Sequence, residues 1–193
     1  MWKQYDKNVN KAIENGIYDP DTEHDACGIG FVAHIKNKKT NQIVQDGLSI
    51  LKNLTHRGAV GADPKAGDGC GILTQIPDNF LRKVAKENDI HLPPEGQYGV
   101  GNFFLPKDAD KRNSYLTQIY KMVDEENLHI LGLRDIPVNN EGLGYSVKPT
   151  EPCHIQIFIS YNKETFDQDE LERKLFVVRK KIYSTFLGQS EKP

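Results

Sequence analysis

The stretch CGIGFVAHI at residues 27–35 decides the fold, because it puts a cysteine directly before the first apolar run of the chain. The residues before it are polar, and Gly16, the Asp19-Pro20 pair and an acidic cluster break any long helix. The glycine-rich apolar residues after the cysteine predict a β-strand over 28–35. A thiol therefore lies where a polar leader, residues 1–26, meets the first predicted strand of the core.

The composition is that of an ordinary globular protein. The chain has 193 residues, of which 37% are hydrophobic and 27% charged, so it suits one domain, with a second allowed but not required. Its formal net charge is −2, and the two signs of charge are nearly balanced. That balance predicts no nucleic-acid surface and no polybasic membrane patch.

The sequence also indicates a cellular compartment. It contains no apolar run of roughly 18 residues, so we expect no membrane span. The leader lacks the apolar core of a secretory signal. Three widely spaced cysteines, Cys27, Cys70 and Cys153, predict free thiols rather than a disulfide framework. We therefore expect a cytoplasmic protein.

The periodicity of apolar residues predicts five strands and four helices. The expected strands cover 28–35, 70–77, 97–106, 128–136 and 153–160. The expected helices cover 42–54, 78–88, 109–126 and a last segment from about residue 167. Thr40 or Asn41 is expected to cap the first helix, and Asp108 the third. Because long loops separate several strands, this order favours a layered α/β sandwich with mixed or antiparallel sheets.

Two glycine-rich segments match nucleotide-binding loops only in part. GIGFVA at 28–33 fits the G-x-G-x-x-A pattern, but a strand should precede it and a helix should follow, and here that context is reversed. GADPKAGDG at 61–69 lacks the Gly-Lys-Ser/Thr ending of a phosphate loop. No Cys-x-x-Cys or His-x-x-x-His spacing occurs, so we expect no metal site. Cys70 and Cys153 are expected to be small buried residues on strand faces.

Cys27 is different, because removal of residues 1–26 would make it the first residue of the chain. Its own α-amine would then lie within reach of its thiol. With an unperturbed pKa of roughly 7.7–8.0, that amine can act as a general base, whereas an amide nitrogen cannot. Gly28 and Gly30 carry no Cβ and would leave room for a ligand near the thiol. These features predict an N-terminal nucleophile.

Three segments carry a resemblance to a known family: CGIGF at 27–31, LTHRGAVGADPKAGDGCGIL at 54–73 and GLRDIPVNNEGLGYSVKPTEPCHIQIFI at 132–159. They resemble the glutaminase domain of glutamate synthase large subunits, a class II glutamine amidotransferase among the N-terminal-nucleophile hydrolases. The resemblance covers most of the chain and implies a four-layer αββα sandwich, incomplete in this chain, over residues 27–193. It also implies self-removal of a propeptide, residues 1–26.

The resemblance implies a reaction as well. Cys27 would attack the side-chain amide carbon of L-glutamine, release ammonia and leave a glutamyl thioester, which water hydrolyses to glutamate. In this family the ammonia reacts with 2-oxoglutarate, and reduction gives a second glutamate. The reducing half uses FMN and an iron–sulfur cluster, for which this chain has no binding segment. The implied partners are the remainder of the large subunit and a small reductase subunit or ferredoxin, with NADPH, NADH and ferredoxin all open as electron donors.

Arg57 matches the HRG segment that lies near the nucleophile in this family. It would hold the substrate carboxylate or order the thiol pocket, or else pair with Asp63 or Asp68 inside the loop. His56 is expected to stabilise the loop rather than act as a base. Asp68 is expected to set the backbone of the loop.

The family's oxyanion hole, an Asn-Gly pair in an HNGE-like segment, has no counterpart here, and neither has its main substrate arginine. The resemblance therefore implies an N-terminal portion of a longer enzyme. We expect this portion to be nearly inactive alone, since one missing oxyanion donor costs roughly 10²–10³ in rate. The alternative is a non-catalytic scaffold or regulatory module with the same sandwich.

Overall fold

The computed structural model describes residues 28–54 and 69–161 continuously, and it also describes residues 14–15, 63, 65–66 and 167–190. Residues 187–190 are described by their backbone alone. The chain divides into two compact units. The smaller unit comprises residues 1–60 with 67–72, and the larger unit comprises residues 61–66 with 73–193.

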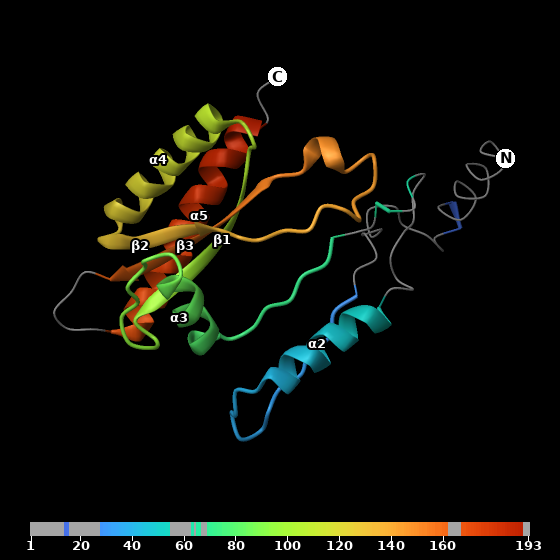
Figure 1. Ribbon diagram of the computed structural model, residues 1–193, viewed down its shortest axis with the longest axis horizontal. Coiled ribbons are helices and arrows are strands. Elements are labelled where there is room, and N and C mark those ends of the chain that lie inside the picture. The colour runs from blue at the N-terminus through green and yellow to red at the C-terminus, as the bar shows by residue number, and fades with distance from the viewer. Residues whose placement is uncertain are drawn as a thin grey trace. The chain divides into compact units, whose positions relative to one another are not determined.

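A three-stranded antiparallel sheet forms the centre of the larger unit (Figure 1). Its strands are β1 (Tyr98–Leu105), β2 (Leu128–Asp135) and β3 (Cys153–Tyr161), in the spatial order β1-β3-β2. Both outer strands run antiparallel to β3, so β1 and β2 are parallel to each other. Helix α4 (Ala109–Glu125) makes the crossover that a parallel pair of strands requires.

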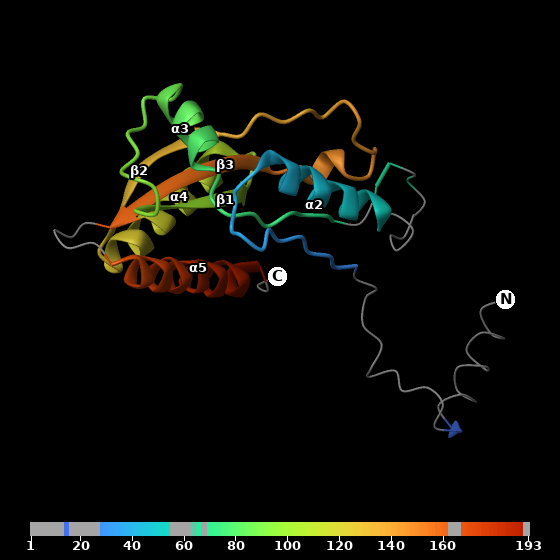
Figure 2. The same ribbon diagram turned by 90° about the horizontal axis from the view of Figure 1, so that it is seen from below.

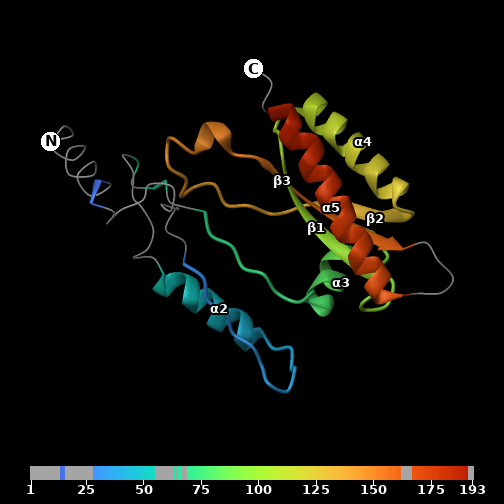
Figure 3. The same ribbon diagram turned by 180° about the vertical axis from the view of Figure 1, so that it is seen from behind.

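Helices cover both faces of this sheet. Helix α4 and helix α5 (Gln168–Ser190) lie side by side on one face, and helix α3 (Asp78–Lys86) lies on the other (Figure 2 and Figure 3). A short 3-10 helix, Lys148–Thr150, interrupts the connection between β2 and β3. The sheet is thus the middle of three layers in the larger unit.

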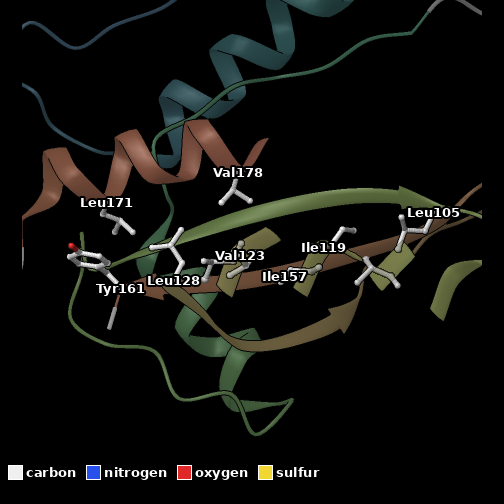
Figure 4. Packing of buried hydrophobic residues seen from close by; sticks show 10 residues of the cluster. Leu105, Ile119, Val123, Leu128, Ile157, Tyr161, Leu171 and Val178 are labelled. Atoms are coloured by element: carbon white, nitrogen blue, oxygen red, sulfur yellow. The ribbon is translucent and has the colours of Figure 1, made fainter. Parts of the chain in front are cut away.

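The central strand β3 packs on both faces, as the alternation of its residues predicts. Ile155, Ile157 and Ile159 cluster with residues of α4 and α5, and Phe158 clusters with residues of α3. The larger cluster (Figure 4) consists of Leu105, Ile119, Val123, Leu128, Ile155, Ile157, Ile159, Tyr161, Leu171 and Val178. Since burying one large apolar side chain contributes roughly 1.5–3 kcal/mol, this cluster is the main source of stability of the larger unit.

One polar side chain of β3 connects the whole sheet. Gln156 is buried, and its Oε1 accepts a hydrogen bond from Arg134 Nε of β2 at 2.8 Å. Its Nε2 donates a hydrogen bond to Asn102 Oδ1 of β1 at 2.9 Å. Because both ends of the amide are satisfied, Gln156 links all three strands without leaving a buried polar group unpaired.

Two helix starts follow their sequence signals. Asp108 caps α4, where its Oδ1 accepts a hydrogen bond from the Lys111 backbone N–H at 2.8 Å. Thr40 is the N-cap residue of α2 (Asn41–Asn53) in the smaller unit, but its side chain makes no capping hydrogen bond. Both predicted caps are therefore confirmed in position, and only Asp108 caps through its side chain.

All four predicted helices and three of the five predicted strands are confirmed, with ends that differ by a few residues. The strands predicted at 28–35 and 70–77 are wrong, because neither segment has strand structure. Ile29 is 92% exposed and Leu73 is 99% exposed. An alternating pattern predicts the faces of a strand, but a strand also needs a hydrogen-bonding partner. The described residues provide no partner for either segment.

The architecture agrees with the fold class expected from the sequence. Helices packed on an antiparallel sheet are consistent with an incomplete αββα sandwich, of which the described residues contain one sheet. Within the described residues, no helix combines the length and the apolar character that crossing a membrane requires.

Candidate active site

The residues that the sequence singles out for chemistry lie outside the described part of the chain. These are Cys27, the predicted nucleophile, and Arg57, the predicted substrate-pocket residue, together with His56 and Asp68. Their roles therefore stay predictions. The structure does describe segments next to them in the sequence, including parts of the glycine-rich loop at 55–71.

The segment that follows Cys27 packs against helix α2 within the smaller unit. A Cβ built on Gly30 would lie 2.3 Å from Cγ2 of Ile50, and one built on Gly28 would lie 3.0 Å from Cδ2 of Leu54. The first contact is far too short and the second is very tight, so glycine lets the backbone run close to the helix. Side chains of α2 thus occupy the space that the sequence predicted for a ligand beside these glycines.

A buried carboxylate, that of Asp63, lies in a short turn of the larger unit, where the Ala66 backbone N–H donates to the Asp63 carbonyl at 3.0 Å. Asp63 is 5% exposed. Its Oδ2 accepts hydrogen bonds from the Ser146 backbone N–H at 2.9 Å and from the Ser146 hydroxyl at 2.8 Å. Its Oδ1 accepts a third hydrogen bond from the Lys65 backbone N–H at 3.0 Å, which closes a local turn. The bond to Ser146 joins two positions that are 83 residues apart in the sequence.

The backbone of Gly144 lies directly against this carboxylate. A Cβ built on Gly144 would come within 2.3 Å of Asp63 Oδ2 and within 2.7 Å of its Cγ. Any residue larger than glycine at this position would therefore displace Asp63. Gly142, two residues earlier, has open space where a Cβ would lie. Asp63, Gly144 and Ser146 together form a cluster that we call the Asp63 lock.

The same hydrogen bonds set the charge state of Asp63. The Ser146 backbone N–H does most to lower the pKa of Asp63, while desolvation acts in the opposite direction. The Ser146 hydroxyl, the Lys65 N–H and the Lys65 charge lower this pKa further. Asp63 is therefore an anion at neutral pH and a weak base. Its geometry suits a structural hydrogen-bond acceptor and not a proton-transferring residue.

The Asp63–Ser146 bond is a finding of the structure, since the sequence presents Asp63 only as a partner for Arg57. A local signal exists in the sequence, because an Asp followed by a Pro favours a turn that the Asp side chain closes. No signal in a single sequence links position 63 to position 146. The lock therefore emerges only from the fold of the larger unit.

Cys70 and Cys153 are free thiols, with Cys70 exposed and Cys153 half-buried. The expectation of a buried residue is thus wrong for Cys70, because the strand predicted around it does not form. In the described part of the chain, no group of three or more His, Cys, Asp or Glu side chains is placed to hold a metal ion.

A family comparison matches nearly all of the chain after residue 26. The sequence model described as "Glutamine amidotransferases class-II" matches residues 27–192. The first matched residue is Cys27, and the matched range includes Arg57 and the Asp63 lock.

Several curated proteins of similar sequence are glutamate synthases. The chain is 44% identical over 165 residues to the glutamate synthase (NADPH) large chain of Bacillus subtilis, and this alignment covers 86% of the chain and 11% of that protein. It is 38% identical over 169 residues to the glutamate synthase (NADH) of Schizosaccharomyces pombe, covering 85% of the chain and 8% of that protein. It is 36% identical over 169 residues to the chloroplastic ferredoxin-dependent glutamate synthase 2 of Arabidopsis thaliana, and this alignment covers 88% of the chain and 10% of that protein. The chain thus spans about a tenth of the length of these relatives.

Proposed function

The chain belongs to the class II glutamine amidotransferases, and from this premise we propose that Cys27 is the nucleophile of a glutaminase. The observation that carries the proposal is the family match over residues 27–192, which begins at the cysteine that the sequence singles out. The family description names glutamine, which supports L-glutamine as the substrate. The domain would then be residues 27–193, with residues 1–26 as its propeptide.

Loss of residues 1–26 would free the α-amine of Cys27, which then takes the thiol proton. The thiolate attacks the side-chain amide carbon of glutamine and forms a C–S bond, and the carbonyl oxygen becomes an oxyanion. The α-ammonium returns a proton to the amide nitrogen, the C–N bond breaks and ammonia leaves. Water then gives a proton to the amine and attacks the thioester. The C–S bond breaks, the α-ammonium returns its proton to the leaving sulfur, and glutamate and the free thiol result.

Arg57 is the proposed substrate-pocket residue. Its guanidinium would hold the α-carboxylate of glutamine through two parallel hydrogen bonds, for which its planar shape is suited. The place of Arg57 in the HRG segment, which matches the family's loop near the nucleophile, supports this role. The oxyanion donors that the reaction needs are not among the residues we assign in this chain. We therefore propose that these 193 residues alone have little glutaminase activity.

For the whole enzyme we propose that the ammonia is used with 2-oxoglutarate to make a second glutamate. The names of the relatives, which include glutamate synthases with NADPH, NADH and ferredoxin in their descriptions, support this step. The remainder of a large subunit, and a reductase subunit or ferredoxin, would be the partners. The descriptions of the relatives differ in the electron donor, and we propose no single donor for this chain.

We assign FMN and the iron–sulfur cluster of such an enzyme to no residue of this chain. An iron–sulfur cluster needs several cysteine thiolates close together. The chain has three cysteines, at positions 27, 70 and 153. Among the described residues, no group of three or more metal-ligating side chains is placed to hold such a cluster, and no step of the reaction proposed here depends on it.

The proposal is tested by substituting cysteines in the full-length protein and measuring glutamate release from glutamine. We expect Cys27→Ala to lower the rate by roughly 10³-fold or more, because a covalent step loses its nucleophile. Cys70→Ala is the matched control, since Cys70 is an exposed free thiol. Wild-type activity in Cys27→Ala, or an equal loss in Cys70→Ala, would overturn the proposal.

A further inference from the structure

We propose that Arg134 is a docking residue for a segment of the longer polypeptide, which packs on the sheet of the larger unit and offers an aspartate or glutamate carboxylate to the Arg134 guanidinium. All residues that carry this inference are described and belong to the larger unit. The inference goes beyond the proposed function, because it concerns how this unit contacts the remainder of the protein and not the reaction with glutamine.

Arg134 lies in one row with two other polar residues across the sheet. Gln156 of β3 is opposite Asn102 of β1 and opposite Arg134 of β2 in the register. Side chains alternate along a strand, so this row lies on the same face as Phe158, which packs with helix α3. Helix α3 also packs with Tyr98, the first residue of β1, and thus covers the half of this face where β1 begins. The row lies on the other half.

Arg134 forces the direction of the hydrogen bonds along the row, because a guanidinium has donors and no acceptor. Gln156 therefore turns its Oε1 toward Arg134 Nε, at 2.8 Å, and its Nε2 toward Asn102, at 2.9 Å. Asn102 accepts this second bond with its Oδ1, so its own NH₂ group points away from Gln156. The row thus presents donors at both ends, the NH₂ of Asn102 on β1 and the two NH₂ groups of Arg134 on β2.

The charge of Arg134 has no counter-ion among the described residues. Within them, its side chain makes the hydrogen bond to Gln156, and no carboxylate lies within ion-pair distance. Arg82, by comparison, pairs with Asp78 and donates to two backbone carbonyls. Arg179 is fully open to water as an exposed residue of α5, whereas Arg134 is half-buried. A half-buried cation without an anion is costly, so we infer that the Arg134 guanidinium receives a carboxylate.

The spacing of the donors indicates a polypeptide segment and not a small anion. Neighbouring strands are about 4.8 Å apart, so the two ends of the row are separated by roughly 10 Å, which one carboxylate cannot bridge. Phe104, two residues after Asn102 on the same face, is 69% exposed, and its ring lies edge-on to that of His154 at 5.0 Å. The occupant therefore brings a carboxylate for Arg134, a carbonyl for Asn102 and an apolar side chain for Phe104.

We infer that this segment comes from the same polypeptide. The chain aligns with only about a tenth of each relative, so most of such a protein lies outside it. Two polar contacts and one aromatic ring form a small surface, whereas stable contacts between separate proteins bury about 800 Å² on each partner. A tethered segment needs less area, because its effective concentration is high.

The test is a zero-length crosslink in the full-length protein that carries Arg134→Lys. Lysine keeps the positive charge, and a carbodiimide takes up water as it joins this amine to a carboxylate in contact with it. We expect peptide mass spectrometry to find position 134 joined to an Asp or Glu of the same polypeptide outside residues 1–193. Arg179→Lys, at an exposed position of α5, is the matched control and should not give this product. A product with a separate subunit or with a residue of 1–193, or no product at position 134 in a folded protein, would overturn the inference.

Phenylglyoxal modification of the wild-type full-length protein is a second measurement, which decides the matter if Arg134→Lys does not fold. The reagent attacks guanidinium groups, and a paired carboxylate should slow its reaction with Arg134 about tenfold or more relative to the urea-unfolded protein. Arg134 should then react as slowly as Arg82, whose pairing with Asp78 makes it the matched reference. A smaller slowing would overturn the inference. Both measurements read masses, so neither outcome depends on whether Cys27 is the nucleophile of a glutaminase.

Discussion

Truncation of Ile157 to alanine tests whether the sheet and the helices α4 and α5 form the stabilising core. Ile157 is fully buried in the middle of the central strand, among residues of both helices (Figure 4). Its partner on β1 is Gly101, which has no side chain to fill the space left behind. Loss of a buried isoleucine side chain costs about 2–5 kcal/mol, and we expect about 3 kcal/mol or more here. For a chain of this size that corresponds to a fall in Tm of roughly 6–12 °C.

The assay is urea unfolding followed by circular dichroism, with Ile35→Ala as the matched control. Ile35 is fully exposed in a segment that the sequence predicts as a strand and that forms none. We expect its truncation to change the free energy of unfolding by less than about 0.5 kcal/mol. A small effect of Ile157→Ala would refute the placement of the core. Equal effects of the two substitutions would refute the exposure of the segment that contains Ile35.

Three further predictions follow from single interactions. Asp108→Ala should lower the free energy of unfolding by about 1 kcal/mol, because helix α4 loses its side-chain cap, and Thr40→Ala should lower it by clearly less, because the Thr40 side chain makes no capping hydrogen bond. The midpoints of urea unfolding of the two variants test this difference. Gln156→Ala should cost about 1–2 kcal/mol, since it leaves groups of both outer strands without their partner, whereas alanine at the exposed Gln75 should be nearly neutral in the same assay. The pKa of Asp63 is lowered mainly by the Ser146 backbone N–H, so the stabilising effect of this carboxylate is fully present above about pH 5 and is lost as the pH falls through the lowered pKa. The difference in urea midpoint between wild type and Asp63→Asn should therefore shrink as the pH falls, and a difference that grows in acid would contradict the assigned sign.

The helices could be predicted from the sequence because their signals are local. Apolar spacing and a capping residue such as Asp108 lie within the helix that they determine. The strands β1, β2 and β3 could be predicted from the sequence as well, because each has an apolar pattern bounded by turn residues. Position 70, by contrast, shows the limit of such patterns. The segment around Cys70 alternates as a strand does, yet pairing depends on residues far away in the sequence.

For the candidate site, the sequence predicts a chemistry, which stays a prediction, and it predicts no contacts between side chains. The context of Cys27 in the sequence suffices to propose a nucleophile, because the argument needs only the leader and the residue itself. Asp63 could not be predicted as an anchor, since its main partner is Ser146, 83 positions away. Gly144 likewise reads as one glycine among several in a loop. Only the fold shows that it lies against a buried carboxylate.

The measurement that tests the central claim most directly is the intact mass of the full-length protein and of its Cys27→Ala variant, each shown to be folded. A free α-amine at Cys27 requires removal of residues 1–26. We predict that the wild type lacks the mass of these residues and that Cys27→Ala retains it, as expected if Cys27 takes part in its own maturation. Retention of Met1 through Ala26 in both proteins would leave Cys27 without a free amine and would contradict the mechanism.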